Sequence, residues 1–169
     1  MARPPQSAVA RYGTHLGRFR LAQSQSSPAE IAFVTALASR LPAGFLNLAG
    51  RLPLGAVAAL LARAQLYVGP DTAVTHMAAA LGVPTVAFFG PTDIVKWGPW
   101  PKDYSGNGNP WRRLGDQAVG RVRVLQARAP CAPCHKEGCE RNLTSFSDCL
   151  LALRSQAVIS AIEDVVTPV

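Results

Sequence analysis

Three residues that can bind a phosphate or a sugar follow one short apolar run of the chain. Asp71, Thr72 and His76 come after residues 66–68, Leu-Tyr-Val, and the Gly-Pro pair that ends this run. A carboxylate accepts hydrogen bonds from sugar hydroxyls, and the hydroxyl and amide of a threonine can donate to phosphate oxygens. His76 lies about one and a half turns into the helix expected after Asp71, so its imidazole can point back over the same place. A packing role for this histidine is the alternative.

The residues after Asp71 have the pattern of a short buried helix. We expect the helix to begin at Thr72 with the Asp71 carboxylate as its cap, and Gly82 stands where a C-terminal glycine belongs. Its apolar positions are Val74, Met77, Ala78 and Leu81. The uncapped amides and the partial positive charge of the first turn make this N-terminus a natural seat for a phosphate.

A second apolar run, residues 85–89, ends in Gly90, Pro91 and Thr92. Two expected strands, 66–69 and 85–89, therefore lead into polar loops. In an open α/β sheet, such loops at the strand ends form the crevice that binds ligands. We expect Thr92 to offer a second hydroxyl to the same crevice.

Helix and strand patterns alternate on both sides of this segment and predict an α/β fold. Ser27, Pro28 and Glu30 form a capping box ahead of a helix that we expect to lie on the sheet. Further expected elements are a strand at 45–48, a helix at 54–64, a strand at 121–125 and one or two helices within 147–166. This alternation implies a Rossmann-like parallel sheet with flanking helices.

The stretch DTAVTHMAAALGVPTVAFFGPTD, which starts at Asp71 and is followed by WGP, resembles the signature of glycosyltransferase family 9, the ADP-heptose:lipopolysaccharide heptosyltransferases. The resemblance runs from about Ser27 to the C-terminus. It implies a GT-B architecture of two Rossmann-like domains, of which this chain has the C-terminal, nucleotide-sugar-binding half. The implied reaction is the inverting transfer of heptose from ADP-heptose to a lipid-linked acceptor in lipopolysaccharide core biosynthesis.

The same resemblance implies a set of donor-binding residues and no cofactor, because the ADP-sugar is itself the donor substrate. The set is Asp71, Thr72, Ala73, Val74, His76 and Thr92, with Glu30 near the ribose and Leu52 near the adenine. Ala73 stands where the family usually has glycine. No catalytic residue is implied in this chain, because the family's acidic base and its lysine after the first donor-domain strand have no counterpart. The first acidic residue is Glu30, and the lysines are Lys96, Lys102 and Lys136.

The length of the chain limits its domain organisation. With 169 residues it has room for one domain with a good core, whereas a GT-B enzyme needs two. We expect a donor-binding domain at 27–169, incomplete at its start, after an irregular or non-native segment at 1–26 without a visible apolar strand. That segment has four arginines and no acidic residue, which is also the composition of an organellar presequence, although prolines and a glycine interrupt any amphipathic helix.

Composition and charge bound the class of partner. Hydrophobic residues make up 49% of the chain, and no apolar run approaches the roughly 20 residues of a membrane span, so we expect a soluble cytoplasmic domain. The net charge of +7 comes mainly from scattered arginines, which favours a basic surface facing an anionic donor and lipid acceptor over a nucleic-acid-binding surface. Peripheral contact with the inner face of the bacterial inner membrane fits this surface.

Four cysteines offer a different function. Cys131, Cys134, Cys139 and Cys149 are spaced C-x2-C-x4-C-x9-C, with His135 beside the second, which is enough for a tetrahedral zinc site. The CAPCH sequence also fits c-type haem attachment, but neither a signal peptide nor a downstream axial ligand is visible. We expect reduced structural thiols. The alternative is a non-catalytic zinc-binding module for partner or nucleic-acid contacts.

The connection between residues 90 and 119 is unusually long and is rich in Pro, Gly and Trp. Loops of this length inside a domain are often functional. Trp97 or Trp100 can stack on a sugar ring or on the acceptor, and the other interpretation is that they pack over the end of the sheet.

Overall fold

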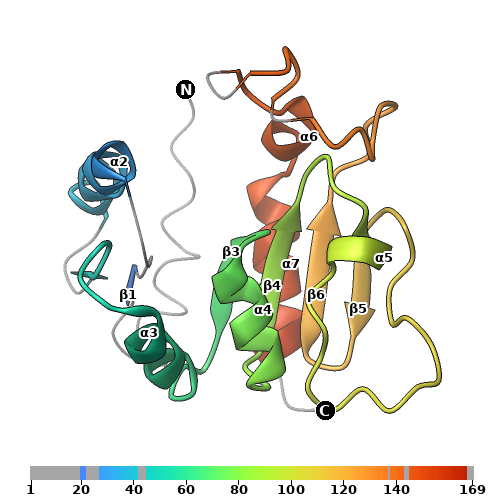
Figure 1. The fold of residues 1–169 in the computed structure, drawn as a ribbon, viewed down its shortest axis with the longest axis horizontal. Helices are drawn as coiled ribbons and strands as arrows, with labels where there is room; N and C mark the ends of the chain where they lie inside the picture. Colours follow the sequence, from blue (N-terminus) through green and yellow to red (C-terminus); the bar gives the residue numbers. More distant parts are fainter. Residues whose placement is uncertain (1–19, 22–26, 42–44, 137, 143–144, 167–169) are drawn as a thin grey trace. The chain divides into compact units, whose positions relative to one another are not determined.

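The computed structural model of the chain describes residues 20–21, 27–41, 45–136, 138–142 and 145–166. The chain divides into two compact units, Met1–Val57 and Ala58–Val169. Figure 1 gives the labels of the helices and strands.

In the first unit, the helix α2 (Pro28–Ala38) begins as the capping box predicts. The Ser27 hydroxyl accepts a hydrogen bond from the Glu30 amide at 3.2 Å, and the Ser27 amide donates to the Glu30 carboxylate at 2.7 Å. This reciprocal pair satisfies two amides that the helix itself leaves without an acceptor. The start of α2 is therefore fixed by local chemistry alone.

The first unit also contains a short parallel strand pair. The strands β1 (Arg20–Leu21) and β2 (Leu46–Asn47) have two residues each. The strand β1 lies in the segment before Ser27, where the sequence shows no apolar strand, and two residues are too few to give a period in the sequence. Apart from β1, the predictions for residues 1–26 fall outside the described residues.

The apolar face of α2 is only partly covered by the described part of its unit. Ile31, Val34 and Ala38 are half-buried, and Asn47 of β2 donates to the Thr35 hydroxyl at 3.2 Å. No described residue of α2 is buried, and Phe33 is 71% exposed. The helix thus contacts the small strand pair, but two strands of two residues are too small to bury 11 helical residues. The next helix, α3 (Leu54–Leu61), spans the boundary between the units and is shorter than the predicted 54–64.

The second unit is built on a four-stranded sheet with the strand order β3-β4-β6-β5. The strands β3 (Tyr67–Pro70), β4 (Thr85–Phe89) and β6 (Val122–Gln126) are parallel, and β5 (Gln117–Val119) is antiparallel to β6. The predicted parallel sheet is confirmed. The antiparallel edge was not predicted.

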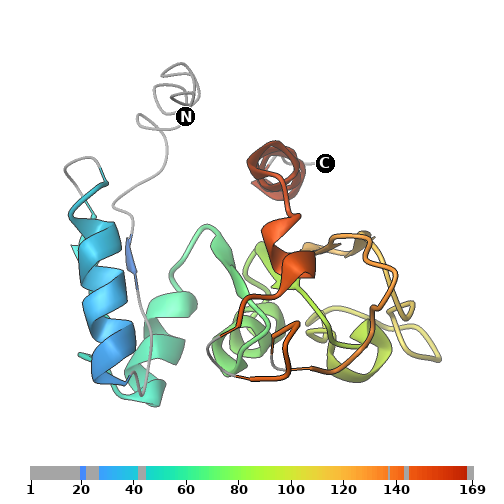
Figure 2. The same ribbon diagram turned by 90° about the horizontal axis from the view of Figure 1, so that it is seen from above.

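Helices cover both faces of this sheet (Figure 2). On one face, α4 (Ala73–Ala80) connects β3 to β4, and α5 (Ile94–Trp97) follows β4. On the other face lies α7 (Ser155–Val166), which is preceded by α6 (Asp148–Leu151). The prediction of one or two helices within 147–166 is confirmed.

Alternate residues of β4 supply the cores of the two faces. Ala87 and Phe89 are fully buried against the α4 and α5 side, whereas Val86 packs under α7. Neighbouring residues of a strand point to opposite faces, so one buried strand can hold both layers together. The larger cluster comprises Ala79, Ala87, Phe89, Ile94, Trp111, Val122 and Val124.

The antiparallel edge arises from a tight hairpin. Only Gly120 and Arg121 separate β5 from β6, and Gly120 has a φ of 53°. A glycine in the left-handed region is the usual first residue of a two-residue hairpin turn. This hairpin places the residues before β5 beside the carboxyl end of β6.

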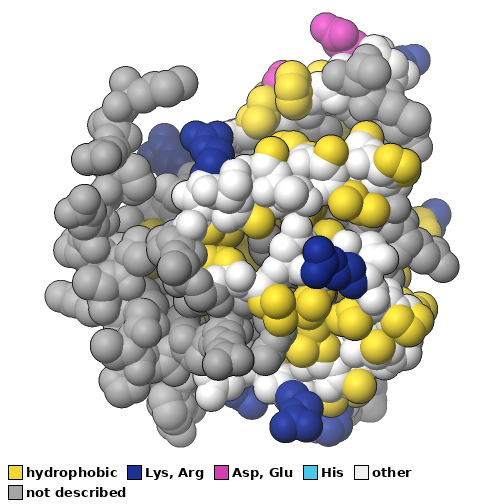
Figure 3. Space-filling view, turned by 90° about the vertical axis from the view of Figure 1, so that its left-hand side faces the viewer, with side chains coloured by type: hydrophobic (Ala, Val, Ile, Leu, Met, Phe, Trp, Pro, Cys, Tyr) yellow, Lys and Arg dark blue, Asp and Glu magenta, His cyan; other side chains and the backbone are white. Residues whose placement is uncertain are grey.

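The surface of the described residues carries its positive charge in separate groups. On the face drawn in Figure 3, Lys and Arg side chains form small groups that lie apart, and one of these groups lies among exposed hydrophobic side chains. Among the described residues, no helix is both long enough and apolar enough to cross a bilayer.

Candidate functional site

The loops that follow β3 and β4 start at the same edge of the sheet. Pro70, the last residue of β3, is in register with Phe88, and the Asp71 amide donates to the Phe88 carbonyl at 3.0 Å. Because the two strands are parallel, both chains leave the sheet side by side. The predicted convergence of the two strand ends is confirmed.

Asp71 is the centre of the polar group at this edge. The Thr92 hydroxyl donates to Asp71 Oδ2 at 3.0 Å, and His76 Nε2 lies 3.7 Å from Asp71 Oδ1. The side chains of Asp71 and His76 are 24% and 40% exposed, so both can reach a ligand. Three side chains from β3's loop, α4 and β4's loop thus meet around one carboxylate, which we call the Asp71 cluster.

The predicted capping role of Asp71 is wrong. Thr72 is the N-cap residue of α4, with φ −145° and ψ 166°, and its side chain makes no capping hydrogen bond. Asp71 stands one residue too early to cap, and its carboxylate turns to Thr92 instead. Ala73 and Val74 therefore begin the helix with backbone amides that no side chain caps among the described residues.

The two neighbours of Thr72 in the predicted set differ in burial. Ala73 is exposed, whereas the Val74 side chain is buried in the core. Only the backbone of Val74 can therefore meet a ligand at the helix N-terminus.

Thr75 supports the site and was missed by the sequence analysis. Its side chain is fully buried, and its hydroxyl donates to the Pro70 carbonyl and is bonded to the Tyr67 hydroxyl at 2.9 Å. These contacts fasten the first turn of α4 to the end of β3. A threonine inside an apolar helix gives no signal of such a role in the sequence.

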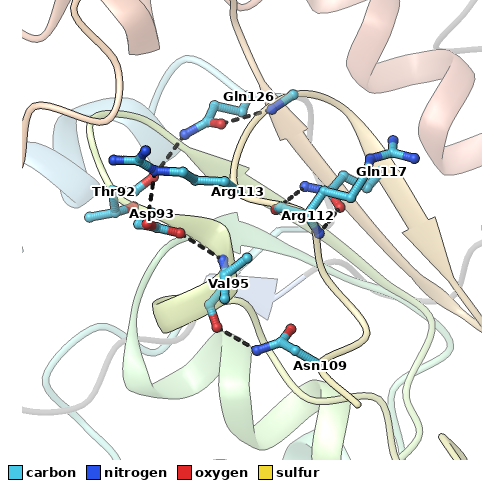
Figure 4. A network of polar contacts seen from close by, with 9 residues as sticks. Thr92, Asp93, Val95, Asn109, Arg112, Arg113, Gln117 and Gln126 are labelled. Atoms are coloured by element: carbon cyan, nitrogen blue, oxygen red, sulfur yellow. Dashed lines mark hydrogen bonds and ion pairs between the residues drawn. The ribbon is translucent and has the colours of Figure 1, made fainter. Parts of the chain in front are cut away.

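The loop that carries Thr92 is held by a buried glutamine at the end of β6. Gln126 Nε2 donates to the carbonyls of Gly90 and Thr92 at 2.8 and 2.9 Å, and Gln126 Oε1 accepts from the Gly115 amide at 3.0 Å (Figure 4). Gln126 is only 2% exposed. It therefore fixes the backbone beside the Asp71 cluster, although the strand predicted from the sequence ends one residue earlier, at Leu125.

The next residue of this loop begins α5. Asp93 accepts from the Val95 amide at 3.0 Å and forms an ion pair with Arg113 at 3.2 Å (Figure 4). Asn109 Nδ2 in turn donates to the Val95 carbonyl at 2.6 Å. Much of the long connection is thus ordered by side-chain contacts to α5.

The three tryptophans of this connection divide into two roles. Trp111 is 4% exposed and donates from Nε1 to the Pro99 carbonyl at 3.2 Å, so it is a core residue. Trp97 and Trp100 are 46% and 50% exposed. Trp100 packs edge-on against Tyr104, with 5.7 Å between ring centroids.

The two remaining residues of the predicted donor set lie in the first unit. Glu30 is engaged in the capping box of α2, and Leu52 is half-buried in the bend before α3. The Asp71 cluster belongs to the second unit.

The four cysteines are free thiols, and no metal centre is formed among the described residues. Cys131 and Cys139 are exposed, Cys134 is half-buried and Cys149 is buried. In the part of the chain that the structure describes, no group of three or more His, Cys, Asp and Glu side chains is placed to hold a metal ion. The zinc-module alternative therefore receives no support from this geometry. Burial raises the pKa of the Cys149 thiol above its ordinary value.

The sequence around this site matches a known protein family. The model of glycosyltransferase family 9 (heptosyltransferase) matches residues 9–119. The chain belongs to this family. The match includes the Asp71 cluster and begins before Ser27, where the resemblance was expected to start, and it ends before the cysteines.

Relatives of this family 9 chain are lipopolysaccharide heptosyltransferases. Lipopolysaccharide heptosyltransferase 1 of Pseudomonas aeruginosa is 40% identical over 105 residues, which is 60% of this chain and 24% of that protein. Lipopolysaccharide heptosyltransferase 3 of Escherichia coli is 43% identical over 53 residues, 31% of this chain and 16% of that protein. The chain thus spans about a quarter or less of the length of these curated relatives.

Solved structures of the family confirm the fold. The structure of E. coli ADP-heptose lps heptosyltransferase II superimposes with a TM-score of 0.63 at 18% identity, covering 95% of this chain and 39% of that one. The family 9 glycosyl transferase of Veillonella parvula gives a TM-score of 0.54 at 18% identity, covering 95% of this chain and 50% of that one. This family 9 chain therefore has the fold class that the sequence predicted, within a family of glycosyltransferases.

Proposed function

We propose that this chain is the donor-binding half of a heptosyltransferase and that it holds an ADP-sugar at the carboxyl ends of β3 and β4. The observation that carries the proposal is the Asp71 cluster, which lies before the open N-terminus of α4 in a chain of family 9. The relatives are named as heptosyltransferases, one of them as an ADP-heptose enzyme, and this supports the choice of donor.

The residues of the cluster divide between the sugar and the diphosphate. The Asp71 carboxylate accepts hydrogen bonds from sugar hydroxyls, while Thr92 keeps it in place. The Thr72 hydroxyl and the amides of Ala73 and Val74 donate to the diphosphate, whose charge the helix N-terminus favours. His76, held beside Asp71, donates to a diphosphate oxygen.

Two further contacts of the proposed site belong to the first unit. By the family resemblance, Glu30 holds the ribose and Leu52 lies against the adenine. These two proposed roles rest on the family resemblance and not on the contacts of the Asp71 cluster.

In the proposed reaction an acceptor hydroxyl attacks the anomeric carbon of the donor. The bond from that carbon to the diphosphate oxygen breaks, the configuration inverts, and ADP leaves with the bonding electron pair. A base outside this chain takes the proton of the acceptor hydroxyl. The amides of α4 and His76 stabilise the negative charge of the leaving ADP.

The proposed acceptor is a lipid-linked oligosaccharide of the lipopolysaccharide core. We place the complete enzyme in the cytoplasm, at the inner face of the bacterial inner membrane, where such an acceptor and a soluble nucleotide sugar can meet. Neither a cofactor nor a nucleic-acid partner is part of this proposal.

Calorimetric titration of ADP into the chain and its variants tests the site. Each of Thr72→Val and His76→Ala removes one hydrogen bond to a charged ligand, so we expect about ten- to a hundredfold weaker binding. His135→Asn is the control, since His135 is exposed and its φ of 54° suits asparagine. If both variants bind ADP like the parent, the Asp71 cluster is a packing arrangement and the proposal is wrong.

A further inference from the structure

Two cysteines come together at the start of α6, in a part of the chain that the family 9 match does not reach. Cys149 lies in the first turn of α6 and is buried. Cys139 Sγ accepts a hydrogen bond at 3.3 Å from the amide of Asp148, the residue before Cys149. The Cys139 amide in turn donates to the Phe146 carbonyl at 2.9 Å. Two contacts therefore hold the sulfur of Cys139 next to Cys149.

The electrostatics of Cys149 agree with this proximity. Burial is the largest cause that raises the pKa of the Cys149 thiol, and the charges of the Cys134 and Cys139 thiolates raise it further. A like charge has this effect only when it lies close by. Cys149 thus has two thiol neighbours, of which Cys139 is exposed and Cys134 is half-buried.

The two thiols of the Cys139–Cys149 pair differ in accessibility. A small oxidant in solution can reach the exposed sulfur of Cys139, whereas Cys149 lies beneath the surface. The thiolate is the reactive form of a cysteine, so the raised pKa of Cys149 makes it the slower of the two to react. Among the described residues no three ligands are placed to hold a metal ion, but a disulfide needs only two sulfur atoms.

We propose that Cys139 and Cys149 are a reversible oxidation site, which a peroxide converts into a disulfide. First, the Cys139 thiolate attacks one oxygen of hydrogen peroxide and the O–O bond breaks. Hydroxide leaves and takes up the proton that the thiol gave up, so water forms and Cys139 becomes a sulfenic acid. Next, the Cys149 thiolate attacks the Cys139 sulfur, the S–O bond breaks, and hydroxide leaves with the Cys149 proton as a second water. The two thiols have then lost two electrons to one peroxide.

The reduced chain is already arranged for this bond. The contacts of Cys139 with Phe146 and Asp148 close the loop that the disulfide would close. The chain entropy of loop closure is therefore lost on folding and not on oxidation. A dithiol reductant restores both thiols by thiol–disulfide exchange.

The oxidation site also touches the loop after β4. The His135 amide donates to the Pro91 carbonyl at 3.0 Å. Leu150 of α6 packs so closely on Gly90 that a Cβ added to this glycine would lie 2.8 Å from Leu150 Cγ. Thr92 follows these two loop residues, so disulfide formation should change the environment of its amide. An effect on ADP binding would rest on the proposed function, whereas the oxidation does not.

Peroxide treatment of the full chain, followed by peptide mapping, tests the site. The reduced chain is treated with one equivalent of hydrogen peroxide, the remaining thiols are alkylated, and linked peptides are identified by mass spectrometry. We expect the Cys139–Cys149 disulfide as the main product, its reversal by dithiothreitol, and shifted amide signals of Gly90 and Thr92 in the oxidised chain. In urea the four thiols should give a mixture of linkages, because the contacts that select this pair are lost.

Matched variants separate the two steps. Cys149→Ala removes the second thiol and should stop the reaction at the Cys139 sulfenic acid, which dimedone traps. Cys139→Ser removes the sulfur that reacts first and should abolish the oxidation of Cys149. Cys131→Ser removes the other exposed thiol and should form the disulfide as the parent does. Thermal unfolding checks that all three variants remain folded.

The outcomes are independent of the proposed function, because neither ADP nor a sugar takes part. A disulfide that joins Cys149 mainly to Cys134, an unselective mixture in the native chain, or no disulfide at all would overturn the proposal. Failure of dimedone to label Cys139 in a folded Cys149→Ala variant would overturn it as well. If the expected disulfide forms and the chain does not bind ADP, the oxidation site stands and the proposed function fails.

Discussion

Single hydroxyl groups hold the Asp71 cluster together from two sides. The Thr92 hydroxyl contacts the Asp71 carboxylate at the surface, and the Thr75 hydroxyl ties α4 to β3 in the interior. A buried hydroxyl that loses its partners costs more than an exposed one, because water cannot replace them. Thr75 is therefore the residue through which the position of α4 can be tested.

We expect Thr75→Val to lower the free energy of unfolding by about 1 to 3 kcal/mol, because it removes a buried hydroxyl that bonds the Pro70 carbonyl. Tyr67→Phe removes only the other partner of that hydroxyl and should cost about 0.5 to 1.5 kcal/mol. Urea unfolding followed by circular dichroism measures both. A Thr75→Val variant as stable as the parent would contradict the tethering role.

The cysteines should differ in reactivity towards iodoacetamide. Burial raises the pKa of Cys149, so less of it is thiolate at a given pH than of an exposed thiol. Cys131 and Cys139 should be alkylated first, and Cys149 last, when peptides are followed by mass spectrometry at pH 8. In denaturant all four should react alike, and rapid native alkylation of Cys149 would contradict its buried position.

The raised pKa of Cys149 also makes the free energy of unfolding depend on pH. The folded state holds the Cys149 proton more tightly than the unfolded chain does. This contribution to the free energy of unfolding is complete below the ordinary thiol pKa of about 8.5 and is lost as the pH rises through the raised value.

At the scale of elements, the sequence patterns predicted those helices and strands that depend on residues close together in the chain. The β4 strand at 85–89, the capping box of α2 and the two C-terminal helices follow from period, cap residues and glycine. The cap of α4 was misassigned, because the choice between Asp71 and Thr72 depends on Thr92, which is distant in sequence and adjacent in space. Gln126 was missed for the same reason.

We expect Gln126→Met to destabilise the loop after β4, although the two side chains are similar in size. The variant leaves the buried Gly90 carbonyl and the Gly115 amide without this partner, at about 1 to 3 kcal/mol for each unsatisfied group. Thermal unfolding should show a clear loss, and ADP affinity should fall because Thr92 is released. Gln117→Met, at a less buried site, should cost about 1 kcal/mol or less, and equal effects would contradict the role of Gln126.

At the scale of the whole molecule, the chain contains the Asp71 cluster but matches only a small part of the length of its relatives. It spans 24% of the Pseudomonas heptosyltransferase and 39% of the E. coli heptosyltransferase II chain. Its net charge of +7 would favour anionic ligands in general. Specificity must therefore come from the placed groups of the Asp71 cluster rather than from the overall charge.

We expect the 169-residue chain alone to transfer no heptose. Neither the acidic base nor the early lysine implied by the family has a counterpart in it. Mass spectrometry of a lipid A–Kdo acceptor incubated with ADP-heptose measures the product, and a full-length family 9 heptosyltransferase is the positive control. Robust transfer by this chain would contradict its proposed role as half of an enzyme.

Of the neighbouring strands in this sheet, the central pair, β4 and β6, is the one whose members lie furthest apart in sequence. The turn at Gly120 closes β5 on β6, and α4 makes a compact link between β3 and β4. Pairing of β4 with β6 instead closes the whole connection from Gly90 onward, and a longer loop loses more chain entropy on closing. During refolding we therefore expect this pairing to form after the other two. Gln126 reaches Thr92 only with that step, so the site would be among the last features of the molecule to assemble.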